Sequence, residues 1–213
     1  MPIATVNVVP PGGLNTRLYL DINRFAQRTS WAHGFMHAWA LWAGLVVMAL
    51  LVVVAYLAGR RSPAAPRAVA ACGLTALAAV AALGLNQAVG HAVGELRPYA
   101  THPHVLVLVG KGTDFSFPSD HSTAAGAIAA GLFAVSWRWG LLGSVLALFL
   151  GFARLYVGAH YPGDVVAGLL LGALVAVLFD AVLLRHLTRL TNWMASTVLA
   201  PLVRARPGVA TTG

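Results

Sequence analysis

Acidic side chains are rare in this sequence. Asp and Glu together number 6 among 213 residues, against 14 Lys and Arg, and all charged residues make up 9% of the chain. Soluble globular domains typically contain about 25% charged residues. Because 59% of the residues are apolar, the composition excludes an ordinary water-soluble globule and indicates an integral membrane protein.

Cysteine is nearly absent as well. The single Cys72 lies inside an apolar run, so it cannot form an intramolecular disulfide, and we expect it to serve packing. The N-terminus also lacks the short basic region, brief apolar core and small-residue cleavage site of a signal peptide. We therefore expect the first long apolar run to remain in the mature protein.

Two long segments contain no Asp, Glu, Lys or Arg, one between Arg28 and Arg60 and one at 68–94. Each is longer than the ~20 residues that are needed to cross a bilayer. Three shorter apolar segments follow, at 122–137, 139–153 and 165–184. The sequence therefore predicts an all-α transmembrane helix bundle with about five spans.

The segment 14–30, "LNTRLYLDINRFAQRTS", precedes the first span. Its residues Leu18, Ile22 and Phe25 recur at helical spacing, while Arg and Asp occupy the other faces. This pattern predicts an amphipathic helix on the outer membrane surface, with an ordinary extramembrane cap as the alternative. We expect one domain over residues 1–206 and a disordered tail at 207–213.

The cations between the spans predict the orientation of the bundle. If the loop between the first two spans lies in the cytoplasm, eight cations lie on the cytoplasmic side of the membrane and six on the outer side. The inner eight are Arg60, Arg61, Arg67, Arg138, Arg185, Arg189, Arg204 and Arg206. Because the cations are scattered between spans rather than gathered in one basic stripe, the net charge of +8 favours anionic lipid head groups over nucleic acid as partners.

Three loops on the predicted outer side carry the unusual polar residues. The first contains Arg97-Pro98, the second contains "PSDH" at 118–121, and the third is "ARLYVGAHYPGD" at 153–164. Ionisable groups near lipid are costly and usually face a bundle interior or an aqueous cavity, so their clustering is a functional-site hypothesis. The short third, fourth and fifth spans agree with outer turns that line a wet pocket.

The residue types in these loops suit a phosphate group. Arg97 and Arg154 offer planar guanidinium groups for bidentate binding of phosphate oxygens. Pro118-Ser119 predicts a helix start with Ser119 as the N-cap, where unpaired backbone N–H groups attract anions. These residues are therefore candidates for substrate binding.

Two histidines and an aspartate complete the cluster. His160 and Asp164 are four residues apart and share a helix face, so the carboxylate can orient the imidazole and leave its other nitrogen basic. His121 is then available to protonate the leaving oxygen. This set suits phosphoryl transfer without a metal, whereas a metal or proton transporter would need polar residues deep within several spans.

The three loops resemble the signature of the type 2 phosphatidic acid phosphatase (PAP2) superfamily. That signature is Lys, six residues, Arg-Pro; then Pro-Ser-Gly-His; then Ser-Arg, five residues, His, three residues, Asp. The resemblance implies a phosphohistidine on His160, general acid catalysis by His121 and support from Asp164. It also implies that Arg97, Ser119 and Arg154 hold phosphate and that no metal cofactor is used.

Three positions depart from the signature. Gly90 stands where the family has Lys, and we consider Lys111, or less strongly His91, as its substitute. Ala153 replaces the family Ser, and Asp120 replaces Gly. We expect Asp120 to hold Arg97, Arg154 or Lys111 in place, and we include Asp120, Lys111 and Pro118 among the candidate substrate-binding residues.

The variants "SFPSDH" and "ARLYVGAHYPGDV" are similar to those of the bacterial PAP2-type undecaprenyl-diphosphate phosphatases. This likeness implies hydrolysis of the polyprenyl diphosphate carrier of cell-wall synthesis at the outer face of the bacterial inner membrane. The alternatives are a PAP2 phosphatase of phosphatidic acid or phosphatidylglycerol phosphate, and a non-catalytic membrane protein with a degenerate site. Gly168 and Gly172 form a GxxxG pair that we expect to pack helices within the chain.

Overall fold

The computed structural model describes residues 13–205, and the secondary structure of this range consists of helices and loops without a strand. The predicted tail, 207–213, lies outside the described residues. The helices are α1 (Leu14–Arg28), α2 (His33–Ala38), α3 (Gly44–Gly59), α4 (Ala65–Val93), α5 (Pro98–Thr101), α6 (Asp120–Val135), α7 (Trp137–Tyr156), α8 (Pro162–Met194) and α9 (Ala200–Val203). A 3-10 turn at Ser30–Ala32 and a π-helical turn at Trp39–Ala43 join α1, α2 and α3.

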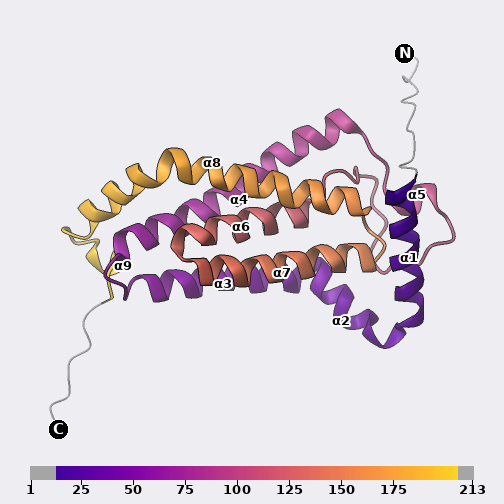
Figure 1. The fold of residues 1–213 in the computed structure, drawn as a ribbon, viewed down its shortest axis with the longest axis horizontal. Coiled ribbons are helices and arrows are strands. Elements are labelled where there is room, and N and C mark those ends of the chain that lie inside the picture. The colour runs from indigo at the N-terminus through magenta and orange to yellow at the C-terminus, as the bar shows by residue number, and fades with distance from the viewer. Residues whose placement is uncertain (1–12, 206–213) are drawn as a thin grey trace, which may run out of the picture.

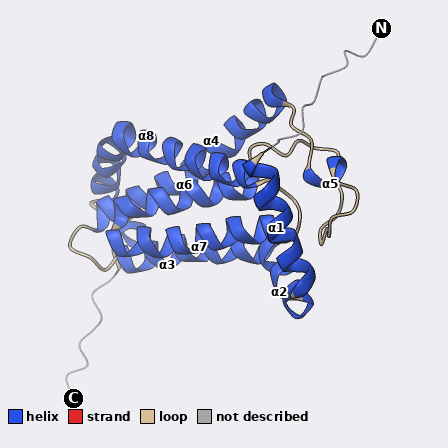
Figure 2. Cartoon of the chain, turned by 45° about the vertical axis from the view of Figure 1, so that its right-hand side comes forward, coloured by secondary structure: helices blue, strands red, loops and turns tan. Residues whose placement is uncertain are grey.

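The long helices α3, α4, α6, α7 and α8 run side by side as one bundle (Figure 1). The short helix α5 and the loops between α4 and α6 gather at one end (Figure 2), and α9 lies at the other (Figure 1). At the first end α1 lies across the bundle axis. The arrangement brings loops that are distant in the sequence to one end of the molecule.

Helix α6 occupies the centre of the bundle, where it contacts α3, α4, α7 and α8. Its 16 residues span about 24 Å at 1.5 Å per residue, which is less than the ~30 Å of a bilayer core. Within residues 13–205, four helical stretches are long and apolar enough to cross a membrane by themselves: Ser30–Gly59, Ala65–Thr101, Trp137–Tyr156 and Pro162–Met194. The predicted third span is thus a short helix that its neighbours surround.

Glycines allow α6 and α8 to approach each other closely. A Cβ at Gly172 would collide with the Thr123 carbonyl oxygen, and a Cβ at Gly126 would collide with the backbone of Leu169. Gly168 likewise faces the carbonyl oxygen of Ser119 at 2.7 Å from an added Cβ. The prediction that the GxxxG pair packs helices within the chain is therefore confirmed.

Helix α1 is present as predicted, but it packs through a different face than its apolar pattern indicates. Tyr19, Asn23 and Ala26 are buried against the bundle, whereas Leu18 is 42% exposed and Phe25 is 52% exposed. Asn23 donates to the Leu106 carbonyl oxygen at 2.7 Å, and its own Oδ1 accepts from the Leu106 N–H at 3.0 Å. The face of α1 that carries Tyr19, Asn23 and Ala26 thus holds the loop between α5 and α6.

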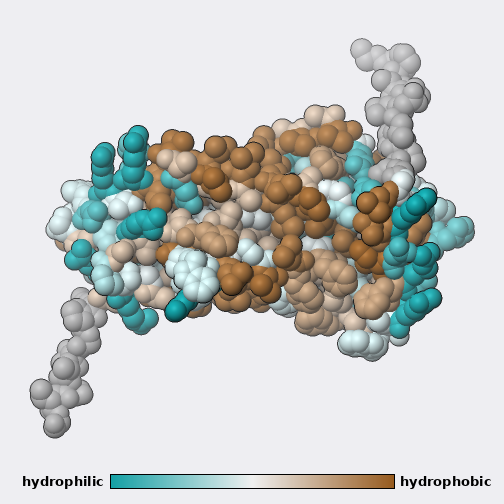
Figure 3. Space-filling view, in the orientation of Figure 1, coloured by the Kyte–Doolittle hydropathy of each residue, from teal (hydrophilic) through white to brown (hydrophobic). Residues whose placement is uncertain are grey.

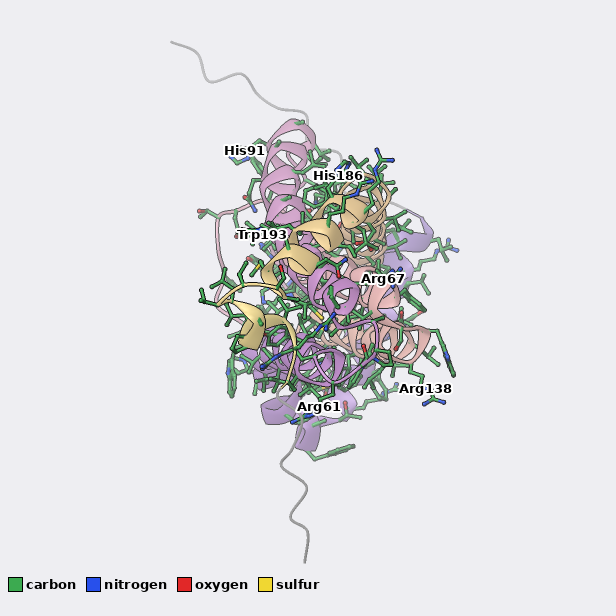
Figure 4. The ribbon with its side chains drawn as sticks, turned by 90° about the vertical axis from the view of Figure 1, so that its left-hand side faces the viewer. Arg61, Arg67, His91, Arg138, His186 and Trp193 are labelled. Atoms are coloured by element: carbon green, nitrogen blue, oxygen red, sulfur yellow. The ribbon has the colours of Figure 1, made fainter. Side chains whose placement is uncertain are left out.

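The surface shows a broad apolar band with polar groups at both ends (Figure 3). Arg61 follows α3, and Arg67 and Arg138 lie in the first turns of α4 and α7, so all three lie at the end opposite the loops (Figure 1). Figure 4 looks along the bundle from this end. The Arg138 guanidinium lies 5.6 Å from the ring centroid of Trp137, which is 64% exposed, as is typical of an aromatic anchor at a membrane interface. Together with the long apolar helices, this surface is that of an integral membrane protein.

Candidate active site

A cavity of about 290 Å³ opens at the loop end of the bundle. Residues from each of the three predicted loops line it. Its Arg, Asp and His lining residues are Arg97, Asp114, Asp120, His121, Arg154 and His160. The structure therefore brings both candidate arginines and both candidate histidines around one space.

His160 sits in the turn between α7 and α8. The turn depends on Gly158, whose φ of 77° lies in the left-handed region that glycine adopts without strain. A Cβ at this position would also collide with the Leu106 carbonyl oxygen. The turn presents the His160 side chain to the cavity while leaving it 2% exposed.

The hydrogen bonds of His160 define its tautomer. Its Nε2 lies 3.2 Å from a guanidinium nitrogen of Arg97 and 3.2 Å from one of Arg154. Because a guanidinium can only donate, Nε2 must accept and carries no proton. The proton therefore resides on Nδ1, which donates to the Ser116 carbonyl oxygen at 2.8 Å.

Burial, together with the positive charges of Arg154 and Arg97, lowers the pKa of His160 to about 4, although the nearby Asp164 acts to raise it. At neutral pH the imidazole is therefore uncharged. A neutral imidazole whose Nε2 lone pair faces two guanidinium groups can act as a nucleophile once an anion takes over those donors.

Asp164 supports His160 less directly than its spacing predicts. Its Oδ2 lies 3.5 Å from the His160 Nδ1, but it accepts shorter hydrogen bonds from the Ser116 Oγ at 2.5 Å and the Tyr161 N–H at 2.8 Å. The Asp164 Oδ1 is buried without a hydrogen-bond partner among the described residues. The carboxylate thus holds Ser116 and the start of α8, and the Ser116 carbonyl oxygen holds the imidazole.

Ser116 is a site residue that the sequence interpretation missed. It is fully buried, and its N–H donates to the Glu95 carbonyl oxygen at 2.8 Å. Its hydroxyl and its carbonyl oxygen contact Asp164 and His160 respectively. The sequence shows a small polar residue directly before "FPSDH". Its role depends on contacts with residues more than 40 positions away, which the neighbouring sequence does not predict.

Arg97 is engaged by a carboxylate that the sequence interpretation also missed. Asp114 accepts two hydrogen bonds from it, at 3.0 Å from Nε and 2.5 Å from one terminal nitrogen. These hydrogen bonds from Arg97 lower the pKa of Asp114 below its ordinary value. The planar, bidentate pair has the geometry with which a guanidinium binds phosphate oxygens, so Asp114 occupies the donors that a phosphate would use.

Arg154 reaches the cavity from the last turn of α7. The residue is 7% exposed, and one of its terminal nitrogens donates to the Ala40 carbonyl oxygen at 3.1 Å. The other contacts His160. This second arginine is therefore fixed between the π-helical turn that precedes α3 and the His160 imidazole.

The "PSDH" segment places its residues in different surroundings. Ser119 is the N-cap of α6, is fully buried, and is not among the residues that line the cavity. Pro118 follows a cis peptide bond, and its carbonyl oxygen accepts from Asn86 at 3.1 Å. His121 lines the cavity, and its Nε2 lies 3.0 Å from the Leu41 carbonyl oxygen. The Nε2 of His121 is therefore protonated, because a carbonyl oxygen can only accept.

Asp120 pairs with amides rather than with the cations that we expected. Its Oδ1 accepts from Asn86 at 2.5 Å and from Gln87 at 2.9 Å, both on α4. No ion pair joins Asp120 to Arg97, Arg154 or Lys111 within the described range. The amides satisfy the carboxylate beside an anion site without neutralising either arginine.

Neither proposed substitute for the missing family lysine lines the active-site cavity. Lys111 is exposed, although its neighbours Gly110 and Gly112 belong to the lining. His91 lines an adjacent cavity of about 260 Å³ together with Gly90. Over residues 13–205, no three His, Cys, Asp or Glu side chains cluster so that they could hold a metal ion.

The sequence is similar to those of known membrane enzymes. A profile of the PAP2 superfamily matches residues 67–186. An undecaprenyl-diphosphatase from Sulfolobus acidocaldarius is 36% identical over 101 residues, which are 46% of this chain and 48% of that protein. A decaprenylphosphoryl-5-phosphoribose phosphatase from Mycobacterium tuberculosis is 33% identical over 152 residues, which are 71% of this chain and 78% of that protein. The match thus spans about half the length of the first relative and more of the second.

The fold is similar to a crystal structure of a transmembrane PAP2 type phosphatidylglycerolphosphate phosphatase from Bacillus subtilis. The TM-score is 0.58, and the match covers 78% of this chain and 84% of the other at 20% sequence identity. At that identity the likeness shows the fold alone. The predicted all-α, PAP2-like membrane bundle is confirmed.

Proposed function

Since the chain belongs to the PAP2 superfamily, we propose that it is a membrane phosphatase that hydrolyses undecaprenyl (polyprenyl) diphosphate to the monophosphate. The observation that carries this proposal is the His160 Nε2, which is unprotonated, lies 3.2 Å from two guanidinium groups and lines the same cavity as His121. A neutral nucleophile, two fixed cations and a second imidazole are the groups that phosphoryl transfer requires.

The proposed first step transfers the terminal phosphoryl group to the enzyme. The phosphate displaces the Asp114 carboxylate from Arg97 and accepts hydrogen bonds from Arg97 and Arg154, which frees the His160 Nε2. This nitrogen then forms a bond to phosphorus while the bond from phosphorus to the leaving oxygen breaks. Burial lowers the pKa of His121, but the negative charge of the bound phosphate raises it. The doubly protonated imidazole that this charge favours then gives one proton to that oxygen.

The proposed second step releases phosphate. A water molecule attacks the phosphohistidine, its proton passes to His121, and the bond between phosphorus and the His160 Nε2 breaks. During both steps the Nδ1–H of His160 donates its hydrogen bond to the Ser116 carbonyl oxygen, which stabilises the positive charge that develops on the ring. Inorganic phosphate leaves and restores the contact between Arg97 and Asp114.

The choice of substrate rests on the likeness of "SFPSDH" and of the third loop to the undecaprenyl-diphosphatase group, and on the relative of that name. A second relative is named a decaprenylphosphoryl-5-phosphoribose phosphatase, so a phosphate monoester carried by another lipid is the alternative substrate. We place the enzyme in a bacterial inner membrane with the cavity on the outer face, because Arg61, Arg67 and Arg138 lie at the opposite end. There it would recycle the lipid carrier of peptidoglycan synthesis.

The test is phosphate release by the purified protein from undecaprenyl diphosphate, phosphatidic acid and phosphatidylglycerol phosphate. We expect kcat/KM for the diphosphate to exceed the others by at least about tenfold, the ratio that 1.4 kcal/mol of differential binding produces. His160→Ala should abolish release, and His104→Ala, an exposed loop substitution, should not. A higher kcat/KM for either glycerolipid would reject the substrate, and full activity of His160→Ala would reject the catalytic assignment.

A further inference from the structure

Two carboxyl groups near the active site each have a buried oxygen atom without a partner. One atom is the Oδ1 of Asp164, and the other is the Oε1 of Glu95, which lies in the loop between α4 and α5. Neither oxygen accepts a hydrogen bond from another described residue. Buried polar atoms in folded proteins are nearly always hydrogen-bonded, so two such atoms next to one site need an explanation.

Ser116 connects the two residues to the catalytic imidazole. Its N–H donates to the Glu95 carbonyl oxygen at 2.8 Å, and its hydroxyl donates to the Asp164 Oδ2 at 2.5 Å. Its own carbonyl oxygen accepts from the His160 Nδ1 at 2.8 Å. Glu95, Asp164 and His160 are therefore linked through one fully buried serine.

The surroundings of these carboxyl groups disfavour two negative charges. Asp164 is fully buried, and its Oδ2 accepts from Ser116 and from the Tyr161 N–H, which stabilises a negative charge on Asp164. Burial of Glu95, together with the charge of Asp164, raises the pKa of Glu95 from 4.5 to about 7. At neutral pH a large fraction of Glu95 therefore carries a proton, unlike an ordinary glutamate.

The ionisable groups coupled to Glu95 lie at the start of α8. They are Asp164 and Tyr161; burial raises the pKa of Tyr161, and the charges of Glu95 and Asp164 add to this increase. The neighbouring ionisable side chains are engaged elsewhere, namely Arg97 with Asp114 and His91 with the backbone of its own helix.

We propose that Glu95 is a positioning residue whose protonated carboxyl group donates a hydrogen bond to the Oδ1 of Asp164. One proton then satisfies both buried oxygens. The contact holds the Asp164 carboxylate against Ser116, and the Ser116 carbonyl oxygen in turn holds the Nδ1–H of His160. The inference rests on the proposed function, since it takes His160 as the nucleophile.

Loss of this proton disturbs the nucleophile and leaves the phosphate-binding arginines in place. When Glu95 is ionised, two buried carboxylates repel each other, and Asp164 holds Ser116 less firmly. Because attack on phosphorus requires an oriented imidazole, kcat falls. Arg97 and Arg154 still bind phosphate, so KM changes little.

Glu95→Gln tests the proposal, because the amide has the shape of the carboxyl group and keeps a donor at every pH. The ratio of its kcat to the parent kcat should rise about fivefold between pH 6 and pH 8.5, as the parent loses the Glu95 proton. Groups that both proteins share, His121 included, affect the two rates alike. A ratio that stays constant with pH would overturn the proposal.

Glu95→Leu, which removes the donor, separates positioning from substrate binding. It should lower kcat about tenfold at pH 6 and change KM less than about twofold, whereas Glu95→Gln should retain most of the kcat that the leucine loses. Full kcat in Glu95→Leu, or a loss confined to KM, would contradict the role of Glu95.

Asp180→Asn is the matched control for the pH dependence. Asp180 is also a partly buried acidic residue, but it lies about 27 Å along α8 from Pro162 at 1.5 Å per residue. The ratio of its kcat to the parent kcat should not depend on pH. A rise equal to that of Glu95→Gln would reject a specific effect of Glu95.

Infrared spectroscopy detects the proton apart from catalysis. The difference spectrum of the parent minus Glu95→Gln at pH 6 should contain the C=O stretching band of a protonated carboxyl group, and this band should disappear at pH 8.5. Absence of the band at pH 6 would reject the proposal even in an active enzyme. Presence of the band in a protein that hydrolyses no lipid phosphate would reject only the proposed function.

Discussion

The protonation of His160 gives the site a distinct pH signature. Its pKa is about 4 in the folded protein and 6.5 for an ordinary histidine. Between these values the unfolded chain binds a proton that the folded chain does not, so stability is lost as the pH falls from about 6.5 toward 4. One such group contributes a slope of at most about 1.4 kcal/mol per pH unit.

We therefore expect His160→Asn to reduce the acid sensitivity of the fold. Thermal unfolding in detergent at pH 7 and at pH 4.5 should show a smaller fall in Tm for this variant than for the parent. His104→Asn, in an exposed loop, is the control and should follow the parent. A parent and a His160→Asn variant with the same fall in Tm would contradict a buried neutral imidazole.

The Arg97–Asp114 pair predicts competition between the carboxylate and phosphate. The Asp114 side chain is 61% exposed, so we assign the pair no more than the 0.2–1 kcal/mol of an exposed ion pair. Asp114→Asn should then lower the inhibition constant of inorganic phosphate by up to about fivefold. Asp21→Asn removes an exposed ion pair with Arg24 on α1 and should have no effect. An inhibition constant that rises in Asp114→Asn would show that the carboxylate positions Arg97 for phosphate instead.

Among the elements, the contact between α6 and α8 carries the tightest packing constraint. A Cβ at Gly172 meets backbone atoms of Thr123 and Ala127, which cannot move away as a flexible side chain could. Gly172→Ala should therefore destabilise the fold by about 1–3 kcal/mol, as overpacking does. Because α6 also begins with the "PSDH" segment, activity should fall together with stability.

Gly73→Ala is the matched substitution for this prediction. Open space surrounds an added Cβ at residue 73, so we expect at most a gain of up to about 1 kcal/mol from helix propensity. Thermal unfolding of both variants in the same detergent makes the comparison. Equal midpoints for the two variants would mean that α6 and α8 do not approach as closely as the structure indicates.

The helices were predictable where composition or periodicity repeats over many residues. The charge-free runs predicted α3 and α4, and the spacing of Leu18, Ile22 and Phe25 predicted α1. The face by which α1 packs was not predictable, because it depends on Asn23 reaching the backbone of Leu106. Hydrogen bonds between distant segments leave no periodic pattern in the sequence.

The candidate site was likewise predictable from the sequence only in part. Short spacings within one segment led to His160 and Asp164, and the unusual polar residues of the predicted outer loops led to His121 and the arginines. The partners of these groups come from far along the chain: Asn86 binds Asp120 across 34 positions, and Ser116 binds His160 across 44. Such pairs depend on how the helices pack, so residue types alone could not identify them.

For the molecule as a whole, the arginines at the end opposite the active-site cavity predict the orientation of the bundle in the membrane: this end faces the cytoplasm and the cavity faces outward. Single cysteines at the exposed positions His104, at the active-site end, and Arg61, at the opposite end, can report it in a Cys72→Ala background. A membrane-impermeant maleimide should label residue 104 in intact cells, and residue 61 only after permeabilisation. The reverse pattern would place the cavity in the cytoplasm and remove the support for carrier recycling on the outer face.

The central claim is that His160 and His121 flank one phosphoryl group, with His160 as the acceptor. The most direct measurement is rapid quenching of the enzyme with undecaprenyl diphosphate, followed by mass spectrometry under conditions that preserve phosphohistidine. We predict a phosphate on residue 160 in the parent and none in His160→Ala. Turnover without any phosphohistidine, or with the phosphate on a different residue, would contradict the account.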